Sequence, residues 1–228
     1  MFLKNIGHRN TYVFGIVFTF CFLVFAAIIN YFTWSPGLTE ASYFVLIIWT
    51  LLYLPIFVFC KYADWEIKDF GYVLNYKVFT LTALAVVIIM FNIHKFPVIN
   101  WKNALVETYA RTGEEVFFRG FLYELILRLF KNKKRPWMWA ILISSICFAI
   151  VHTQTFLPAN QTTMISVFEA AVFLSLMRYW TGSILTGIVI HILVNSGSAY
   201  GVISGILFYY LFTLLAYIKG EEVFKKGI

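Results

Sequence analysis

Long uncharged stretches separated by short charged connections dominate this chain of 228 residues. Five stretches contain no Asp, Glu, Lys or Arg: 10–39, 41–60, 78–94, 136–168 and 179–218. A helix that spans a membrane needs about 20 mostly apolar residues, so the last stretch can hold two helices. The segment 195–201, rich in Ser and Gly, supplies the break between them. Because the apolar runs are continuous rather than alternating, they predict helices and not strands.

The pattern predicts an all-α protein, a polytopic membrane helical bundle with about eight transmembrane helices. The expected helices are 11–33, 41–60, 72–93, 103–130, 136–153, 162–179, 182–196 and 201–218. Residues 1–228 contain no internal repeat, low-complexity tract or linker, so we expect a single integral-membrane domain.

Composition and charge support this fold class. The chain is 61% hydrophobic and only 13% charged, and its mean hydropathy is +0.80, which excludes a soluble globular domain. If the spans alternate, most of the 18 Lys and Arg residues fall in connections on one side, which predicts a multi-pass cell-membrane protein with both termini cytoplasmic. The net charge of +7 therefore requires no nucleic-acid partner. We expect the basic run 131–135 to face anionic lipid headgroups of the bilayer.

Ionisable side chains inside the apolar helices are the candidate site. They are costly in a membrane and by default indicate function. The expected fourth helix contains two adjacent carboxylates and an arginine, the fifth ends near a histidine, and the seventh holds a histidine and an amide. These residues are Glu114, Glu115, Arg119, His152, His191 and Asn195.

Spacing on the fourth helix predicts specific neighbours. Glu107, Arg111, Glu115 and Arg119 follow one another in steps of four, so they share one face as a ladder of alternating charge. A salt-bridged helix that only locks its neighbours is the simpler interpretation of this ladder. It leaves Glu114 unpaired on the neighbouring rim, where a carboxylate facing a cavity has the position of a general base.

The polar residues of the three helices are expected at similar heights in the membrane. At 1.5 Å per residue, Glu115, His152 and His191 lie roughly 20, 22 and 15 Å above the cytoplasmic ends of their helices. His191 and Asn195 are four residues apart and project from one face. We therefore expect the fourth, fifth and seventh helices to enclose a common site.

Three motifs in these helices resemble those of a known family. Residues 112–120 read TGEEVFFRG and contain EExxxR, residues 144–152 read SSICFAIVH and contain FxxxH, and residues 191–195 read HILVN and match HxxxN. In this order they resemble the motifs of the CAAX-protease and bacteriocin-processing family of intramembrane proteases. The resemblance places a catalytic core at 103–200, and the first 100 residues match only in hydropathy.

The resemblance implies an intramembrane endopeptidase that hydrolyses a membrane-associated or lipidated peptide or protein. Glu114 and His152 would activate the attacking water. His191 and Asn195 would stabilise the oxyanion, for which a side-chain amide is a suitable donor. Glu115 and Arg119 would hold the site together, a role that the resemblance assigns to them.

A metal cofactor stays open at this stage. Glu114 or Glu115 with His152 and His191 could form a three-ligand zinc site with an open fourth position. However, the chain has no HExxH helix, and a water activated directly by glutamate needs no ion, so we favour the metal-free mechanism.

Two other functions remain as alternatives. A non-proteolytic immunity or scaffold protein of the same family, protecting its host from a bacteriocin, would use the same residues. A transporter would require two related halves with matching interrupted helices, which the sequence does not show. Glu169, in the expected sixth span, belongs to no motif and is interpreted as a structural partner of Arg178 or a cavity-lining group.

Overall fold

Helices account for the secondary structure of the chain. The computed structural model describes residues 8–33, 42–92, 101–153, 163–196 and 199–223. The elements are α1 (His8–Thr33), α2 (Ser42–Tyr62), η2 (Ile67–Phe70), α3 (Tyr76–Asn92), α4 (Trp101–Glu115), η4 (Val116–Leu122), α5 (Tyr123–Leu129), α6 (Pro136–Val151), α7 (Met164–Thr181), α8 (Leu185–Ser196) and α9 (Ala199–Ile218). The all-α prediction is confirmed.

Each of the eight expected helices corresponds to a helical segment of the structure. The expected fourth helix comprises three elements, because α4, the π-helix η4 and α5 follow one another without interruption from Trp101 to Leu129. The expected fifth helix ends two residues early, at Val151. The short 3-10 helix η2, which lies between α2 and α3, was not expected.

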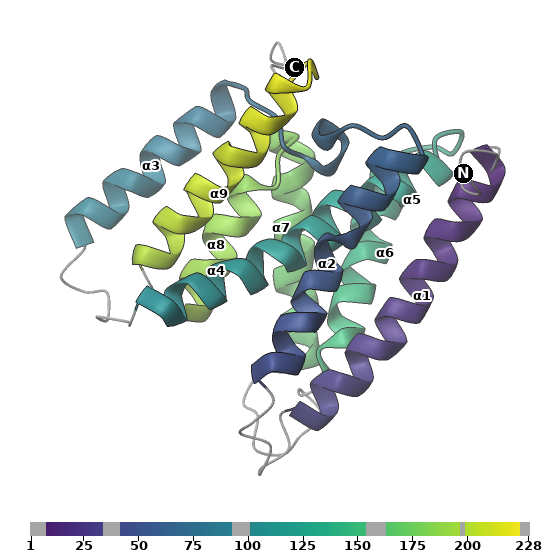
Figure 1. Ribbon diagram of the computed structural model, residues 1–228, viewed down its shortest axis with the longest axis horizontal. Helices are drawn as coiled ribbons and strands as arrows, with labels where there is room; N and C mark the ends of the chain where they lie inside the picture. Colours follow the sequence, from purple (N-terminus) through teal and green to yellow (C-terminus); the bar gives the residue numbers. More distant parts are fainter. Residues whose placement is uncertain (1–7, 34–41, 93–100, 154–162, 197–198, 224–228) are drawn as a thin grey trace.

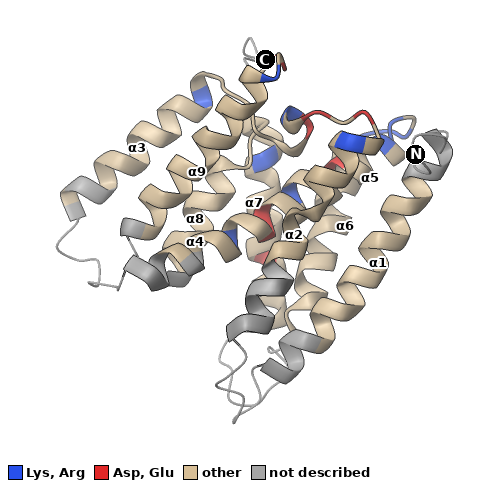
Figure 2. Cartoon of the chain, viewed as in Figure 1, with Lys and Arg blue, Asp and Glu red and all other residues tan. Residues whose placement is uncertain are grey.

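The path α4–η4–α5 crosses the middle of the molecule (Figure 1). It contacts α2 along one side and α8 and α9 along the other, while α6 packs against η4, α5 and α7. Buried aromatic residues of η4 and α2, among them Phe117, Phe121 and Phe59, belong to the hydrophobic core. This arrangement puts Arg111, Glu114 and Glu115 of α4 at the centre of the bundle (Figure 2).

Membrane-spanning length is shown for one helix. In the described part of the chain, the segment Gly201–Ile218 of α9 is long and apolar enough to cross a membrane, with a mean hydropathy of 1.9. Five other apolar helical segments are shorter, and α8, with 12 residues, is about 18 Å long. The eight expected helices are therefore confirmed, whereas the lengths of the described helices do not show eight membrane spans.

The two ends of the molecule differ in charge. The start of α1 and the end of α9 lie at the same end, at the top of Figure 1. Described Lys and Arg residues outside the centre gather at this end, as Figure 2 shows. They include Lys61 at the end of α2, Lys77 at the start of α3, and the exposed turn Lys131–Arg135 between α5 and α6.

Candidate active site

A change of helix type follows directly after the two adjacent carboxylates. Glu114 and Glu115 end α4, and the next seven residues, Val116–Leu122, form the π-helix η4. All seven are buried. Short π-helical segments are rare and often accompany functional sites, because they alter which side chains share a face. Here the change lies between the carboxylates and the rest of their helix.

Glu115 is the most enclosed charged group of the site. Its side chain is fully buried, and its Oε1 accepts hydrogen bonds from Nη1 of Arg119 at 3.0 Å and from Nδ1 of His191 at 2.9 Å. The predicted pairing of Glu115 with Arg119, one turn apart, is confirmed. The guanidinium of Arg119 also lies 4.2 Å from the ring centroid of Phe148 and donates to the carbonyl of Ala171 at 3.5 Å. This one ion pair therefore ties η4 to α6, α7 and α8.

A glycine makes the position of Glu115 possible. A Cβ atom on Gly187 of α8 would lie 2.2 Å from Oε2 of Glu115. Any larger residue would collide with the carboxylate. The carboxylate thus packs directly against the main chain of α8, at Gly187, which is one turn before His191.

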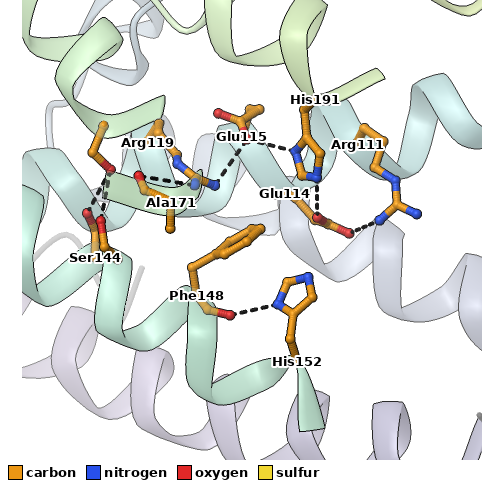
Figure 3. A network of polar contacts seen from close by, with 11 residues as sticks. Arg111, Glu114, Glu115, Arg119, Ser144, Phe148, His152, Ala171 and His191 are labelled. Carbon is orange, nitrogen blue, oxygen red and sulfur yellow. Dashed lines mark hydrogen bonds and ion pairs between the residues drawn. The ribbon is translucent and has the colours of Figure 1, made fainter. Parts of the chain in front are cut away.

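Glu114 is paired, contrary to the expectation from spacing. Its Oε1 accepts a hydrogen bond from Nη1 of Arg111 at 2.9 Å, and its Oε2 lies 3.4 Å from Nε2 of His191 (Figure 3). Arg111 was expected to continue a ladder toward Glu115. It turns instead to Glu114, three residues away, because Glu115 is directed into the core toward Arg119. The side chain of Glu114 retains 12% exposure, whereas that of Glu115 has none.

His191 connects the two carboxylates. Nδ1 faces Glu115 and Nε2 faces Glu114. A neutral imidazole has one donor and one acceptor nitrogen, and a carboxylate only accepts. The contact of Nδ1 with Oε1 of Glu115 is a hydrogen bond at 2.9 Å, whereas Nε2 lies at an ion-pair distance of 3.4 Å from Oε2 of Glu114 without a hydrogen bond. The three side chains thus form one continuous polar group.

His152 lies immediately after α6, at its C-cap. Its Nδ1 is 2.7 Å from the carbonyl oxygen of Phe148, so Nδ1 is the nitrogen that carries the proton in this contact. The ring stacks obliquely on Phe148 with centroids 4.3 Å apart. His152 also interacts electrostatically with Glu114, and Figure 3 shows its ring facing the Glu114 carboxylate.

Phe148 is the apolar centre of the site. Its ring contacts Arg119 and His152, as above, and lies 5.8 Å from the ring of His191. The motif contains this phenylalanine, but sequence reasoning gave it no role. Arg111 and Gly187 were also missed as site residues. The spacing of Arg111 three residues before Glu114 was a signal that could have found the first of them.

Two further polar residues singled out in the sequence are Asn195 and Glu169. Asn195 is in α8, one turn after His191, and its side chain lies outside the described residues. Glu169 is exposed on α7, and the interpretation that it pairs with Arg178 is wrong. Arg178 is buried and donates to main-chain carbonyls, which are described below.

The donor set was tested for a metal. Among the described residues, no group of three or more His, Cys, Asp or Glu side chains is arranged to hold an ion. Of the candidates Glu114, His152 and His191, the last has both ring nitrogens directed at carboxylates. The described side chains therefore do not fit a three-ligand metal site as they stand.

Comparison with known proteins identifies the segment that contains this site. No curated protein and no solved structure matches the chain. A family model, described as type II CAAX prenyl endopeptidase Rce1-like, matches residues 99–197, which include all three motifs. The family is of protease type and membrane-associated. The family resemblance of the motifs is confirmed by this match of residues 99–197 to the Rce1-like family model.

Proposed function

We propose that the protein is an intramembrane endopeptidase in which Glu114 and His152 activate a water molecule for attack on a peptide bond. The observation that carries this proposal is the assembly of Glu114, Glu115 and His191, with His152 facing it, inside an apolar helical protein. Burying ionisable groups in an apolar protein costs desolvation free energy, so such groups are expected where they perform chemistry.

Placement in a membrane is supported by the surface of the helices. Large apolar side chains are exposed on helices on different sides of the bundle, for example Phe20 of α1, Phe57 of α2 and Leu207 of α9. Such a surface favours contact with lipid. The basic residues at one end fit the cytoplasmic face, so we infer a multi-pass protein with both termini in the cytoplasm and the bilayer as its surroundings (Figure 2).

The proposed reaction consists of proton removal from water, attack on the peptide carbonyl and return of the proton to the leaving amine. Glu114 and His152 take a proton from water, and the resulting hydroxide attacks the carbonyl carbon of the scissile bond. The proton then passes to the leaving amine nitrogen, and the peptide bond breaks. Glu115 holds Nδ1 of His191 at 2.9 Å, while the contact of Nε2 with Glu114 is longer, at 3.4 Å. Nε2 is therefore the donor that can turn to the oxyanion, with Asn195 as the second donor.

The substrate is proposed from the family and from the membrane setting. A membrane-associated or lipidated peptide or protein reaches a site enclosed by helices by moving within the bilayer. We propose this class as the substrate and the lipid bilayer as the second partner. The proposed function involves no nucleic acid.

Comparative proteomics tests the proposal. Membranes of cells that produce the wild type, Glu114→Ala or Glu124→Ala are compared for peptides whose processing disappears. Glu124 is the matched control, because it is a carboxylate on the same helical path that pairs with Arg128 at 2.7 Å, outside the site. We expect a peptide processed by the wild type and the Glu124→Ala variant and left intact by Glu114→Ala.

A binding or scaffold function makes the opposite prediction. If Glu114→Ala, His152→Ala and His191→Ala all keep full biological activity while the proteins are produced and folded, the proposed enzyme is wrong. Incubation of the purified protein with a zinc chelator, followed by metal add-back, tests the metal-free mechanism separately. Turnover that falls with the chelator and returns with zinc would replace that mechanism with a metal-dependent one.

A further inference from the structure

A buried arginine outside the three motifs holds the main chain of the site. Arg178, in the last turn of α7, is 7% exposed. Its Nε donates to the carbonyl oxygen of Arg119 at 3.1 Å, its Nη2 donates to that of Asp69 at 3.3 Å, and its Nη1 donates to that of Gly182. A guanidinium has five donors in a fixed planar arrangement, which lets one side chain join several carbonyl oxygens.

The three carbonyls belong to separate parts of the chain. Asp69 is in η2, Arg119 is in the π-helix η4, and Gly182 is in the turn between α7 and α8. Through Arg178, all three are fixed relative to α7. Its side chain also lies beside the ring of Tyr123, 5.8 Å from the centroid, at the start of α5.

The main chain at Gly71 packs closely against the guanidinium of Arg178. It has a φ of +89°, which glycine adopts without strain, and a Cβ there would lie 3.0 Å from Cζ and Nε of Arg178. The carbonyl of Gly71 accepts a hydrogen bond from the amide of Ile184 at 3.2 Å. The segment after η2 therefore touches both Arg178 and the chain leading into α8.

The contact with Arg119 leads directly to the carboxylates. Arg178 holds the carbonyl of Arg119, and the side chain of Arg119 binds Glu115 at 3.0 Å. Glu115 binds Nδ1 of His191 at 2.9 Å, and Nε2 of His191 lies 3.4 Å from Glu114. A side chain that donates into a helix changes its local hydrogen bonding, and this donation lies within the π-helix.

We propose that Arg178 is a positioning residue, which fixes the π-helix η4 and through it the alignment of Glu115, His191 and Glu114. The competing interpretation is a general packing role, since an arginine in the last turn of a helix often satisfies nearby carbonyls. The two differ in where the structure loosens when Arg178 is replaced. The catalytic consequence rests on the proposed function, whereas the structural consequence does not.

Hydrogen–deuterium exchange of the purified full-length protein tests the structural part without any activity. Arg178→Lys keeps the charge but replaces the planar group with a single ammonium, which cannot join three separate carbonyls in the same way. Arg178→Gln removes the charge as well. The matched control is Arg128→Lys, because Arg128 lies on the same helical path and binds Glu124 and Asp69 outside the site.

We expect exchange in peptides covering 114–124 to rise at least tenfold in Arg178→Lys and further in Arg178→Gln, with α3 peptides covering 76–88 unchanged. The control variant should leave both regions unchanged. Unchanged exchange at 114–124 in both Arg178 variants would overturn the proposal. So would a uniform rise in all helices, or failure of both variants to fold, because each indicates a general packing role.

Cleavage kinetics test the catalytic part. The probe is an internally quenched farnesylated peptide that ends in a CAAX sequence, the substrate class named in the family description. Arg178→Lys should lower kcat at least tenfold with KM changed less than twofold, while Arg128→Lys keeps both. An unchanged kcat despite faster exchange at 114–124 would overturn the positioning role. If the wild type cleaves no substrate at all, the proposed function fails and the exchange result still decides the role of Arg178 in the structure.

Discussion

Two charged clusters lie on the same helical path from Trp101 to Leu129, and they differ in burial. The inner cluster joins Glu115 to Arg119, with side-chain exposures of 0% and 1%. The outer cluster joins Arg128 to Glu124 and to Asp69 of η2, and these side chains are between 15% and 29% exposed. The residue types and the contact distances are nearly the same in both.

An ion pair by itself therefore does not indicate a functional site, because similar pairs occur inside and outside the candidate active site. At the end of α5 the charges keep contact with water, and such pairs contribute little to stability. Glu115 and Arg119 are both removed from water, and only their mutual pairing and hydrogen bonds offset the cost of that desolvation. The inner cluster also recruits His191, which connects it to the partly exposed Glu114. A fully buried ion pair connected to a carboxylate that keeps some exposure is an arrangement that supports chemistry.

The largest effect is expected from a change that preserves the inner cluster and removes the neighbouring proposed base, Glu114. Glu114→Gln keeps the shape of the side chain but cannot take a proton from water. We expect peptide cleavage to fall by about 10²–10⁴-fold, the usual contribution of a general base. Initial rates on the substrate identified by proteomics check this. Glu124→Gln, the same change in the outer cluster, should keep at least half of the wild-type rate, and equal losses in both would remove the distinction between the clusters.

The next effect is on stability. Arg119→Met leaves the carboxylate of Glu115 buried without its strongest partner. Breaking a buried pair in this way costs about 3–5 kcal/mol of unfolding free energy. Denaturant unfolding in detergent measures it. A loss below about 1 kcal/mol, the range of an exposed pair, would show that the inner pair is no more important than the outer one.

A smaller effect is expected from Gly187→Ala, which inserts a methyl group where the Glu115 carboxylate now lies. Overpacking of this size costs about 1–3 kcal/mol, and the displaced carboxylate should also lower the cleavage rate. Gly205→Ala on α9 is the control, because the new methyl group would meet Cδ1 of Ile192 and Cγ2 of Ile188 and no carboxylate. Paired measurements of unfolding and cleavage should show loss of activity for Gly187→Ala alone. Full activity in both variants would contradict the close fit of Glu115 to α8.

The smallest effect is expected in the outer cluster. Arg128→Met removes the ion pairs with Glu124 and Asp69 and the contact of the guanidinium with the buried ring of Trp65. The unfolding free energy should fall by about 1 kcal/mol or less, and the difference from wild type should shrink further at high salt. Unfolding curves at two salt concentrations provide the measurement, and a salt-independent loss as large as that of Arg119→Met would be contrary to the comparison.

Much of the fold followed from the sequence, because apolar length and the position of charges are local properties. Eight apolar segments gave eight helices, with ends that differ from expectation by a few residues. The three motifs predicted a resemblance to the family whose model matches residues 99–197. The pairing of Glu115 with Arg119 was also predictable, since residues four apart on a helix are neighbours.

The partners of the other polar groups were decided by tertiary structure. Spacing within one helix left Glu114 without a partner, and it could not show that His191, 76 residues after Glu115, lies between the two carboxylates. The sequence offered Glu169 as a structural partner of Arg178 or as a cavity-lining group, whereas the guanidinium binds the carbonyls of Asp69, Arg119 and Gly182. Periodicity indicates which residues share a face of a helix. Which neighbouring helix meets that face, and at what height, depends on how all the helices pack together, and that is where the candidate site is formed.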